Sequence, residues 1–144
     1  MTIEEIYKLW EEDGEIDVGN LTGESVNIPK LHNKYYKLYV EENLKARKRR
    51  QDLKDLMLLK EAYYKGEMDR DDLKEQGWEP FPKRLLKAEV AKYIEVDKDI
   101  VELSLRIGIQ EEKVQYLESI LKMIGNRSFH IKNAIEWEKF KVGA

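Results

Sequence analysis

The chain has 144 residues, of which 42% are hydrophobic and 38% are charged, with a formal net charge of −3 and no cysteine. This length suits one domain, or one compact unit with an extension, and the lack of cysteine excludes disulfides and thiol chemistry. No apolar run reaches the roughly 18 residues of a transmembrane helix, so no membrane partner is expected. The share of charged residues is high for a self-contained globular domain. An oligomer that shares its core between subunits is therefore one interpretation of this composition.

The N-terminal segment is acidic and amphipathic. Residues 1–25 hold eight carboxylates and one lysine, a pattern that does not fit a secretory signal. Asp17 is predicted to cap a short second helix. A first helix is expected over residues 3–11, ending before Gly14, with an apolar face made of Ile3, Ile6, Tyr7 and Trp10.

A long helix is expected from Pro29 to about Lys65. Proline suits the first turn of a helix, Asn27 precedes it as a candidate cap, and Gly66 fits the C-terminal stop. At 1.5 Å per residue this helix would be about 55 Å long. Its middle part, residues 41–52, is polar nearly all round, which is typical of a stretch that faces solvent or a charged partner.

Residues 67–84 contain one glycine and two prolines and are predicted to form a loop. Trp78 and Phe81 within this segment are expected to hold it against a surface of the protein.

A heptad pattern follows, with apolar residues at alternating intervals of three and four after position 100. It predicts helix-to-helix packing of the coiled-coil type, with Gln110 as one polar interruption. Two alternatives stay open for Gln110: a buried residue that fixes register or oligomeric state, or an exposed residue beside Gly108. The seam consists of Tyr93, Val96, Ile100, Leu103, Ile107, Gln110, Val114, Leu117, Leu121 and Ile124.

The last helix is expected after Gly125-Asn126, with Ser128 as its candidate cap. No alternating strand pattern competes with these helices, so the predicted fold class is all-α, with long helices, a coiled-coil-like heptad segment and a C-terminal helix. The predicted division of the chain is an N-terminal helical region (1–66), a loop or linker (67–84) and a helical oligomerisation region (85–144).

Catalytic chemistry is poorly supported. The sequence holds no glycine-rich phosphate loop, and its two histidines, His32 and His130, have no candidate nucleophile beside them. Asp97 and Asp99 could in principle join other aspartates around Mg²⁺, but residues two apart diverge on a helix. The sequence therefore predicts no enzyme, no cofactor and no metal site.

The most unusual segment is KARKRR at residues 45–50, because the chain as a whole is acidic. Three interpretations compete: a solvated face paired with nearby carboxylates, a targeting signal, and a phosphate-binding patch. The aromatic pair Tyr63-Tyr64 near the end of the same helix is of the type that stacks on bases of single strands, or else it packs in a core. The cations of this region are Lys45, Arg47, Lys48, Arg49, Arg50 and Lys54.

Several short elements in order resemble the UvsY family of recombination mediators from T4-type bacteriophages. The early elements are Ile16-Asp17, Leu21, Glu24, Asn27, Leu31, Lys34 and Tyr35, and the later ones are Tyr63–Gly66, Asp97–Asp99, Arg127–Lys132 and Phe140. They cover most of the chain, whereas residues 67–95 match poorly and form a longer segment than the family pattern has.

The resemblance implies a non-enzymatic protein that acts in the cytoplasm of the infected bacterial host. Such proteins bind single-stranded DNA, destabilise the phage single-strand DNA-binding protein on it and promote loading of a phage RecA-type recombinase, in homologous recombination and recombination-dependent replication. They work as ring-like homo-oligomers, hexamers or heptamers, in which the C-terminal helices dominate assembly.

The resemblance also bears on single residues. Lys60 matches a family cation that contributes to DNA binding, whereas Leu58 stands where a second cation is expected, which shifts weight to the 45–54 cluster. The predicted DNA-binding set is therefore those six cations with Lys60, Tyr63 and Tyr64. An alternative function is a coiled-coil scaffold that binds no DNA. The predicted oligomerisation residues are Leu117, Leu121, Ile124, Phe129, Ile131, Ile135, Trp137 and Phe140.

Overall fold

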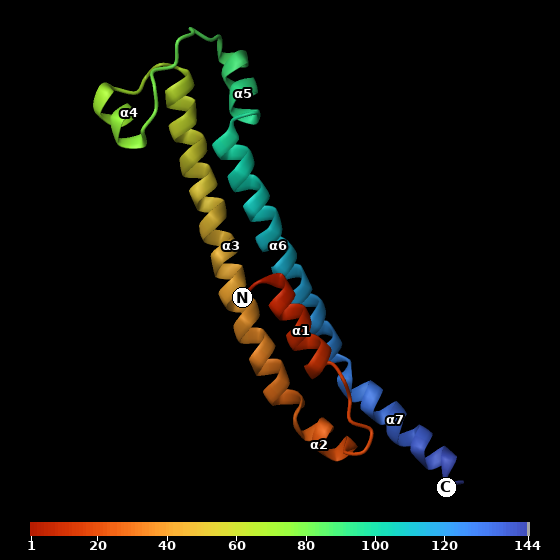
Figure 1. Cartoon of the computed structure of the whole chain (residues 1–144). Coiled ribbons are helices and arrows are strands. Elements are labelled where there is room, and N and C mark those ends of the chain that lie inside the picture. Colours follow the sequence, from red (N-terminus) through yellow and green to blue (C-terminus); the bar gives the residue numbers. More distant parts are fainter. Residues whose placement is uncertain (144) are drawn as a thin grey trace. The chain divides into compact units, whose positions relative to one another are not determined.

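The computed structural model describes residues 1–143, and every regular element in this range is an α-helix, which confirms the predicted fold class (Figure 1). The helices are α1 (Ile3–Asp13), α2 (Leu21–Val26), α3 (Ile28–Tyr64), α4 (Arg70–Gln76), α5 (Lys87–Glu95), α6 (Lys98–Gly125) and α7 (Arg127–Lys141). Over the same residues, no helix has both the length and the apolar character needed to cross a membrane.

The chain divides into two compact units. The first unit combines Met1–Leu44 with the residues from Glu111 onward, and the second unit is Lys45–Gln110. This division differs from the predicted one, because α3 and α6 each contribute residues to both units.

The start of the chain follows simple capping rules. The Thr2 hydroxyl accepts a hydrogen bond from the Glu5 amide at 3.2 Å while the Glu5 carboxylate accepts one from the Thr2 amide at 2.9 Å, a capping box that starts α1. The prediction that Asp17 caps α2 is wrong. Asp17 instead accepts from the amide of Gly19 two residues on, and Asn20 caps α2 by accepting from Gly23 at 3.2 Å.

The long helix is confirmed as α3, which has 37 residues and begins one residue before Pro29. It ends where predicted: Gly66 has a φ of 73°, in the left-handed region that favours glycine. The amide of Glu67 donates to the carbonyl of Ala62, and that of Gly66 to the carbonyl of Tyr63, so two terminal carbonyls of α3 are satisfied.

The core of the first unit lies where α1, the first half of α3 and the second half of α6 meet (Figure 1). Tyr35 is fully buried at its centre, and its hydroxyl donates to Asp13 at 2.9 Å. Burial and this hydrogen bond raise the pKa of Tyr35. The buried residues are Ile6, Leu31, Tyr35, Leu117, Ile120 and Ile124.

The heptad seam is confirmed from Ile100 to Ile124, where each predicted position is buried or half-buried. Gln110 is completely buried, and its side-chain oxygen accepts from Arg49 at 3.3 Å, so the exposed alternative for Gln110 is wrong. The observed seam does not include the predicted Val96, which is 71% exposed, because α5 ends at Glu95 and a new helix begins after Asp97.

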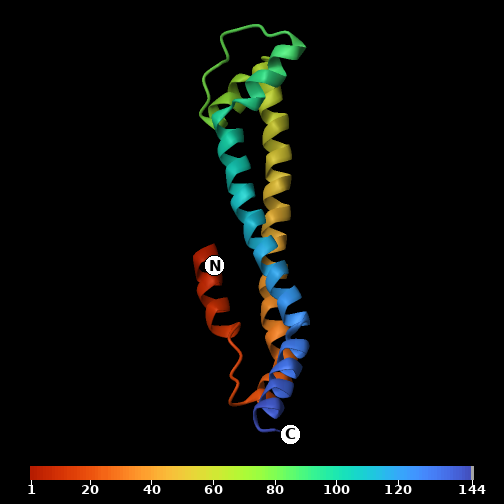
Figure 2. The same cartoon turned by 90° about the vertical axis from the view of Figure 1, so that its right-hand side faces the viewer.

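The predicted loop 67–84 contains a helix that the prediction missed. Asp69 caps α4 by accepting from the Asp72 amide at 2.8 Å, and Gly77, with a φ of 74°, ends it. The expected anchoring of this segment is confirmed, since Trp78 and Phe81 pack against aromatic rings of α3. Figure 2 shows the backbone of this segment beside the C-terminal end of α3.

Helix α7 is held to the N-terminal region by Arg127, which is 6% exposed. Its guanidinium donates to the carbonyls of Gly14 and Glu15 at 3.2 and 3.1 Å and to the Glu24 carboxylate at 2.8 Å. Asn126, and not the predicted Ser128, occupies the N-cap position of α7, and its side chain makes no capping hydrogen bond.

Arg127→Ala is expected to lower the free energy of unfolding by about 2 kcal/mol, because it removes charge-assisted hydrogen bonds and leaves their acceptors unpaired. Urea denaturation measures the change. Lys132→Ala, at an exposed position on the same helix, is the control and should change stability by less than about 0.5 kcal/mol. Equal effects of the two substitutions would contradict the anchoring role of Arg127.

Candidate nucleic-acid interface

The basic segment, residues Lys45–Lys54, is an uninterrupted stretch of α3 in the second unit. Ala46 is 1% exposed and Leu53 is half-buried, so one side of the helix faces the protein. Five of the six cations are exposed, namely Lys45, Arg47, Lys48, Arg50 and Lys54, whereas Arg49 is half-buried and donates to Gln110.

Three of the exposed cations are unpaired. Arg47, Lys48 and Lys54 have no hydrogen-bond or ion-pair partner within residues 1–143, whereas Lys45 and Arg50 do have interaction partners. The carboxylate of Asp55, one of the expected helical partners, instead accepts a hydrogen bond from Gln51 at 3.1 Å. The interpretation as a face neutralised by its own carboxylates therefore does not account for these three charges.

The exposed cations Arg47, Lys48, Arg50 and Lys54 share a broad side of the helix. At about 100° per residue, Arg47, Arg50 and Lys54 lie within about 60° of one another, and Arg47 and Lys54 are about 10 Å apart along the axis. Lys48 lies about 100° from Arg47 and widens this surface. Such an arrangement suits contacts with several successive phosphates of one strand and offers no pattern for reading bases.

Lys60 is not part of the exposed surface that the basic segment forms. It is 6% exposed, and its ammonium group contacts Asp97 at 3.1 Å and Asp99 at 2.8 Å. The same nitrogen sits 4.0 Å from the ring centroid of Trp78, within cation–π range. In this arrangement the Lys60 side chain is buried and paired within the chain, and its role in DNA binding stays a prediction.

Tyr63 and Tyr64 are half-buried in a cluster with three other aromatic rings, Trp78, Phe81 and Tyr93. The Tyr63 hydroxyl donates to the carbonyl of Glu79 at 2.7 Å, and the Tyr64 hydroxyl donates to Asp97 at 2.6 Å. Of the two alternatives for this pair, packing inside the protein is the one that the structure describes.

Asp97 is the centre of this cluster and was missed as a structural residue. One carboxylate oxygen accepts from the amides of Asp99 and Ile100 and caps α6, while the other contacts Lys60 and Tyr64. Burial alone would raise the pKa of Asp97, but the hydrogen bonds from Tyr64, Ile100 and Lys60 outweigh it and lower the pKa. Burial and the hydrogen bond to Asp97 raise the pKa of Tyr64.

The sequence did carry a signal for this cluster, namely the closely spaced aspartates Asp97 and Asp99. They were expected to diverge as neighbours on one helix, but Asp97 precedes α6 and Asp99 lies in its first turn, so both reach Lys60. Within residues 1–143 no group of three or more histidine, cysteine, aspartate or glutamate side chains is arranged to hold a metal ion.

The predicted oligomerisation residues fall into two groups. Leu117, Ile124 and Ile131 are at most 2% exposed within one chain, and Leu121 is half-buried. Phe129, Trp137 and Phe140 are 58–72% exposed on α7, and Ile135 is 38% exposed. Only the second group is available to another molecule.

Comparison with known proteins agrees with these features. The family model described as "Recombination, repair and ssDNA binding protein UvsY" matches residues 9–144. The chain belongs to the UvsY family. A search among curated proteins found no match to it.

Two crystal structures of the bacteriophage T4 recombination mediator protein UvsY resemble this UvsY-family chain, each with 21% sequence identity and a TM-score of 0.83. One comparison covers 97% of this chain and 99% of the T4 chain, and the other covers 99% and 98%. At this identity the likeness establishes a shared fold over nearly the whole of both chains. The family description names recombination, repair and DNA binding, and no catalytic activity.

Proposed function

We propose that this UvsY-family chain is a recombination mediator that binds single-stranded DNA through the exposed cations of the basic segment. The observation that carries the proposal is the set of three unpaired cations, Arg47, Lys48 and Lys54, on a part of α3 that is polar nearly all round. Lys45, Arg49 and Arg50 flank them and complete the positive surface. The proposed DNA path does not include Lys60, Tyr63 and Tyr64. Lys60 is paired with Asp97, and the two tyrosines pack in the aromatic cluster.

Binding of this kind is electrostatic. Cations that neutralise phosphates release the counterions condensed on the strand, which favours association and makes it depend on salt. The contacts carry no sequence information, which suits a protein that has to act on any single strand.

Assembly is the second part of the proposal. The chain forms a ring-like homo-oligomer of six or seven copies, with the exposed residues of α7 contributing to the contacts between subunits. The support is the exposure of Phe129, Trp137 and Phe140, three large aromatic side chains on one helix that are 58–72% exposed within residues 1–143. An oligomer would repeat the basic segment once per subunit, so that modest contacts combine along one strand.

The family relationship supports the finer steps. The oligomer would destabilise the phage single-strand DNA-binding protein on DNA and promote loading of the phage RecA-type recombinase, in the cytoplasm of the infected host. Non-specific binding to the phosphate backbone fits this role, because it holds the strand while its bases stay free for pairing.

A salt titration tests the proposed function. With about four phosphates neutralised per subunit, the logarithm of the binding constant for labelled oligo-dT should fall with the logarithm of salt concentration at a slope near −3 per subunit, at about −0.7 per contact. Fluorescence anisotropy measures both quantities. If micromolar protein shows no salt-sensitive binding, the scaffold function is correct instead.

A further inference from the structure

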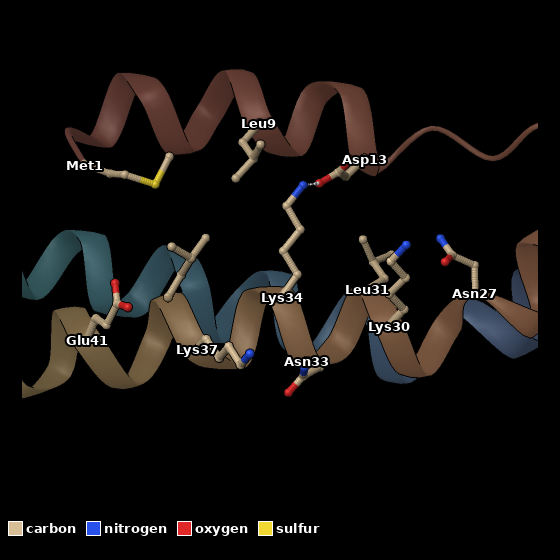
Figure 3. Close-up of a pocket in the computed structure, with 11 residues that line it drawn as sticks. Met1, Leu9, Asp13, Asn27, Lys30, Leu31, Asn33, Lys34, Lys37 and Glu41 are labelled. Atoms are coloured by element: carbon tan, nitrogen blue, oxygen red, sulfur yellow. Dashed lines mark hydrogen bonds and ion pairs between the residues drawn. The ribbon is translucent and has the colours of Figure 1, made fainter.

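A groove of about 770 Å³ runs between α1 and α3 in the first unit (Figure 3). Its floor is apolar: Leu31 is buried, and Leu9 and Leu38 are half-buried against the core. Lys34 crosses the groove from α3 and forms an ion pair with Asp13 of α1 at 2.6 Å. The groove can therefore accept apolar side chains beside this bridge.

The α3 rim of the groove carries charges that are not neutralised. Lys30, Lys37 and Glu41 are exposed and have no hydrogen-bond or ion-pair partner within residues 1–143. Lys37 and Glu41 are four residues apart, which places them about one turn apart on the same side of α3. A ligand that fits this rim needs an apolar part between charges of both signs.

The end of α7 has this composition. Trp137 and Phe140 are 58% and 72% exposed, and their rings stack on each other with centroids 5.5 Å apart. Buried aromatic side chains each remove about 150–250 Å² from water, so exposing this pair is costly. Glu136 and Lys139 flank the rings, are three residues apart, and have no hydrogen-bond or ion-pair partner within residues 1–143.

We propose that the α1/α3 groove of one copy binds the end of α7 of a second copy. The stacked Trp137 and Phe140 enter the apolar floor. Glu136 pairs with Lys37 and Lys139 pairs with Glu41, since both charge pairs have the spacing of one helical turn and opposite sign. This inference rests on the assembly part of the proposed function and not on DNA binding.

The contact has a consequence for symmetry. It joins two different surfaces, a groove and a helix end, so it is head-to-tail, and repeated contacts of this type close into a ring when the rotation per subunit allows it. Packing of α7 against α7 of a second copy through the same face of both helices would instead join identical surfaces in pairs. The two arrangements predict different effects of changes in the groove.

The test uses two full-length variants that exchange charges without changing the net charge. Lys37→Glu/Glu41→Lys alters the groove, and Glu136→Lys/Lys139→Glu alters α7. Light scattering over a concentration series measures assembly, and circular dichroism confirms that each variant is folded. Each variant alone is expected to need at least about tenfold more protein to assemble than the unaltered chain does.

Mixing the two variants decides between the arrangements. Each altered groove then meets an altered α7, and each unaltered groove an unaltered α7, when the two variants alternate. A ring of six then closes with matched contacts throughout and a ring of seven with all but one, so assembly is expected to recover in both cases. A groove variant that assembles normally, or a mixture that stays dissociated, overturns the proposal. Loss of assembly in Trp137→Ser/Phe140→Ser with normal assembly in the groove variant would keep α7 as the interface but show that the groove is free for another occupant. An unaltered chain that is monomeric overturns both this contact and the proposed assembly.

Discussion

Replacing Arg47, Lys48 and Lys54 together by glutamine is expected to weaken binding to oligo-dT by roughly 100-fold per subunit at about 0.1 M salt. Each phosphate contact contributes about 0.7 to the slope of log K against log salt, so three contacts are worth about two decades at this salt concentration. The slope itself should become less steep by about 2 per subunit. Fluorescence anisotropy across a salt series measures both changes.

The matched control is Arg84→Gln/Lys87→Gln/Lys92→Gln, which removes the same amount of charge from exposed positions of the second unit outside the basic segment. It should lower the affinity little and leave the slope nearly unchanged. Similar losses in both triple variants would mean that net charge, and not the basic segment, governs binding.

Asp97→Ala is expected to lower the free energy of unfolding by about 3–5 kcal/mol, because it leaves the buried ammonium of Lys60 with one carboxylate, removes the cap of α6 and leaves the Tyr64 hydroxyl without its acceptor. For a chain of this size the loss corresponds to a fall in Tm of roughly 10 °C. Calorimetry measures it. A fall of only a degree or two would show that the cluster contributes little.

The stabilising effect of Asp97 should depend on pH. Its pKa is lowered in the folded protein from an ordinary value of 3.8, so the folded state binds this proton more weakly than the unfolded state does. The contribution is therefore fully present above pH 3.8 and is lost as the pH falls below that value through the folded pKa. The difference in stability between the unaltered chain and Asp97→Ala should shrink over this acidic range.

Lys60→Met distinguishes a contribution of Lys60 to stability from a contribution to DNA binding. It should cost about 1–3 kcal/mol, less than Asp97→Ala, because Asp97 keeps the Tyr64 hydroxyl and two backbone amides as donors. Affinity for oligo-dT should stay within about twofold of the unaltered chain at temperatures where the variant is folded. A loss as large as that of the Arg47, Lys48 and Lys54 variant would return Lys60 to the DNA-binding surface.

Local patterns predicted much of this fold. The 3.6-residue period identified α1 and α3, and Gly66 was identified as the end of α3 because helices commonly end on a left-handed glycine. The heptad seam identified the buried side of α6. Predictions of the residue that caps a helix were less successful. The Asn20 side chain caps α2 in place of Asp17, and α7 begins at Asn126 without a side-chain cap in place of the predicted Ser128.

Sequence patterns could not predict contacts between residues that lie far apart in the sequence. The burial of Lys60 depends on Asp97 and Asp99, more than thirty positions later, and on Trp78 from a segment predicted as a loop. Helix α4 could have been anticipated from its Asp69 cap and Gly77 stop, but the nearby prolines pointed to a loop. The division of the predicted oligomerisation residues into buried and exposed groups likewise depends on how α7 packs within the first unit.

In the proposed function, one oligomer holds one strand through basic segments repeated around it. The solution mass, measured with and without oligo-dT, tests this arrangement. We expect an oligomer of six or seven copies in the absence of DNA, and the same oligomer plus one strand after addition of a long oligo-dT. A monomer that binds oligo-dT with full affinity, or an oligomer whose mass does not change with oligo-dT, would contradict it.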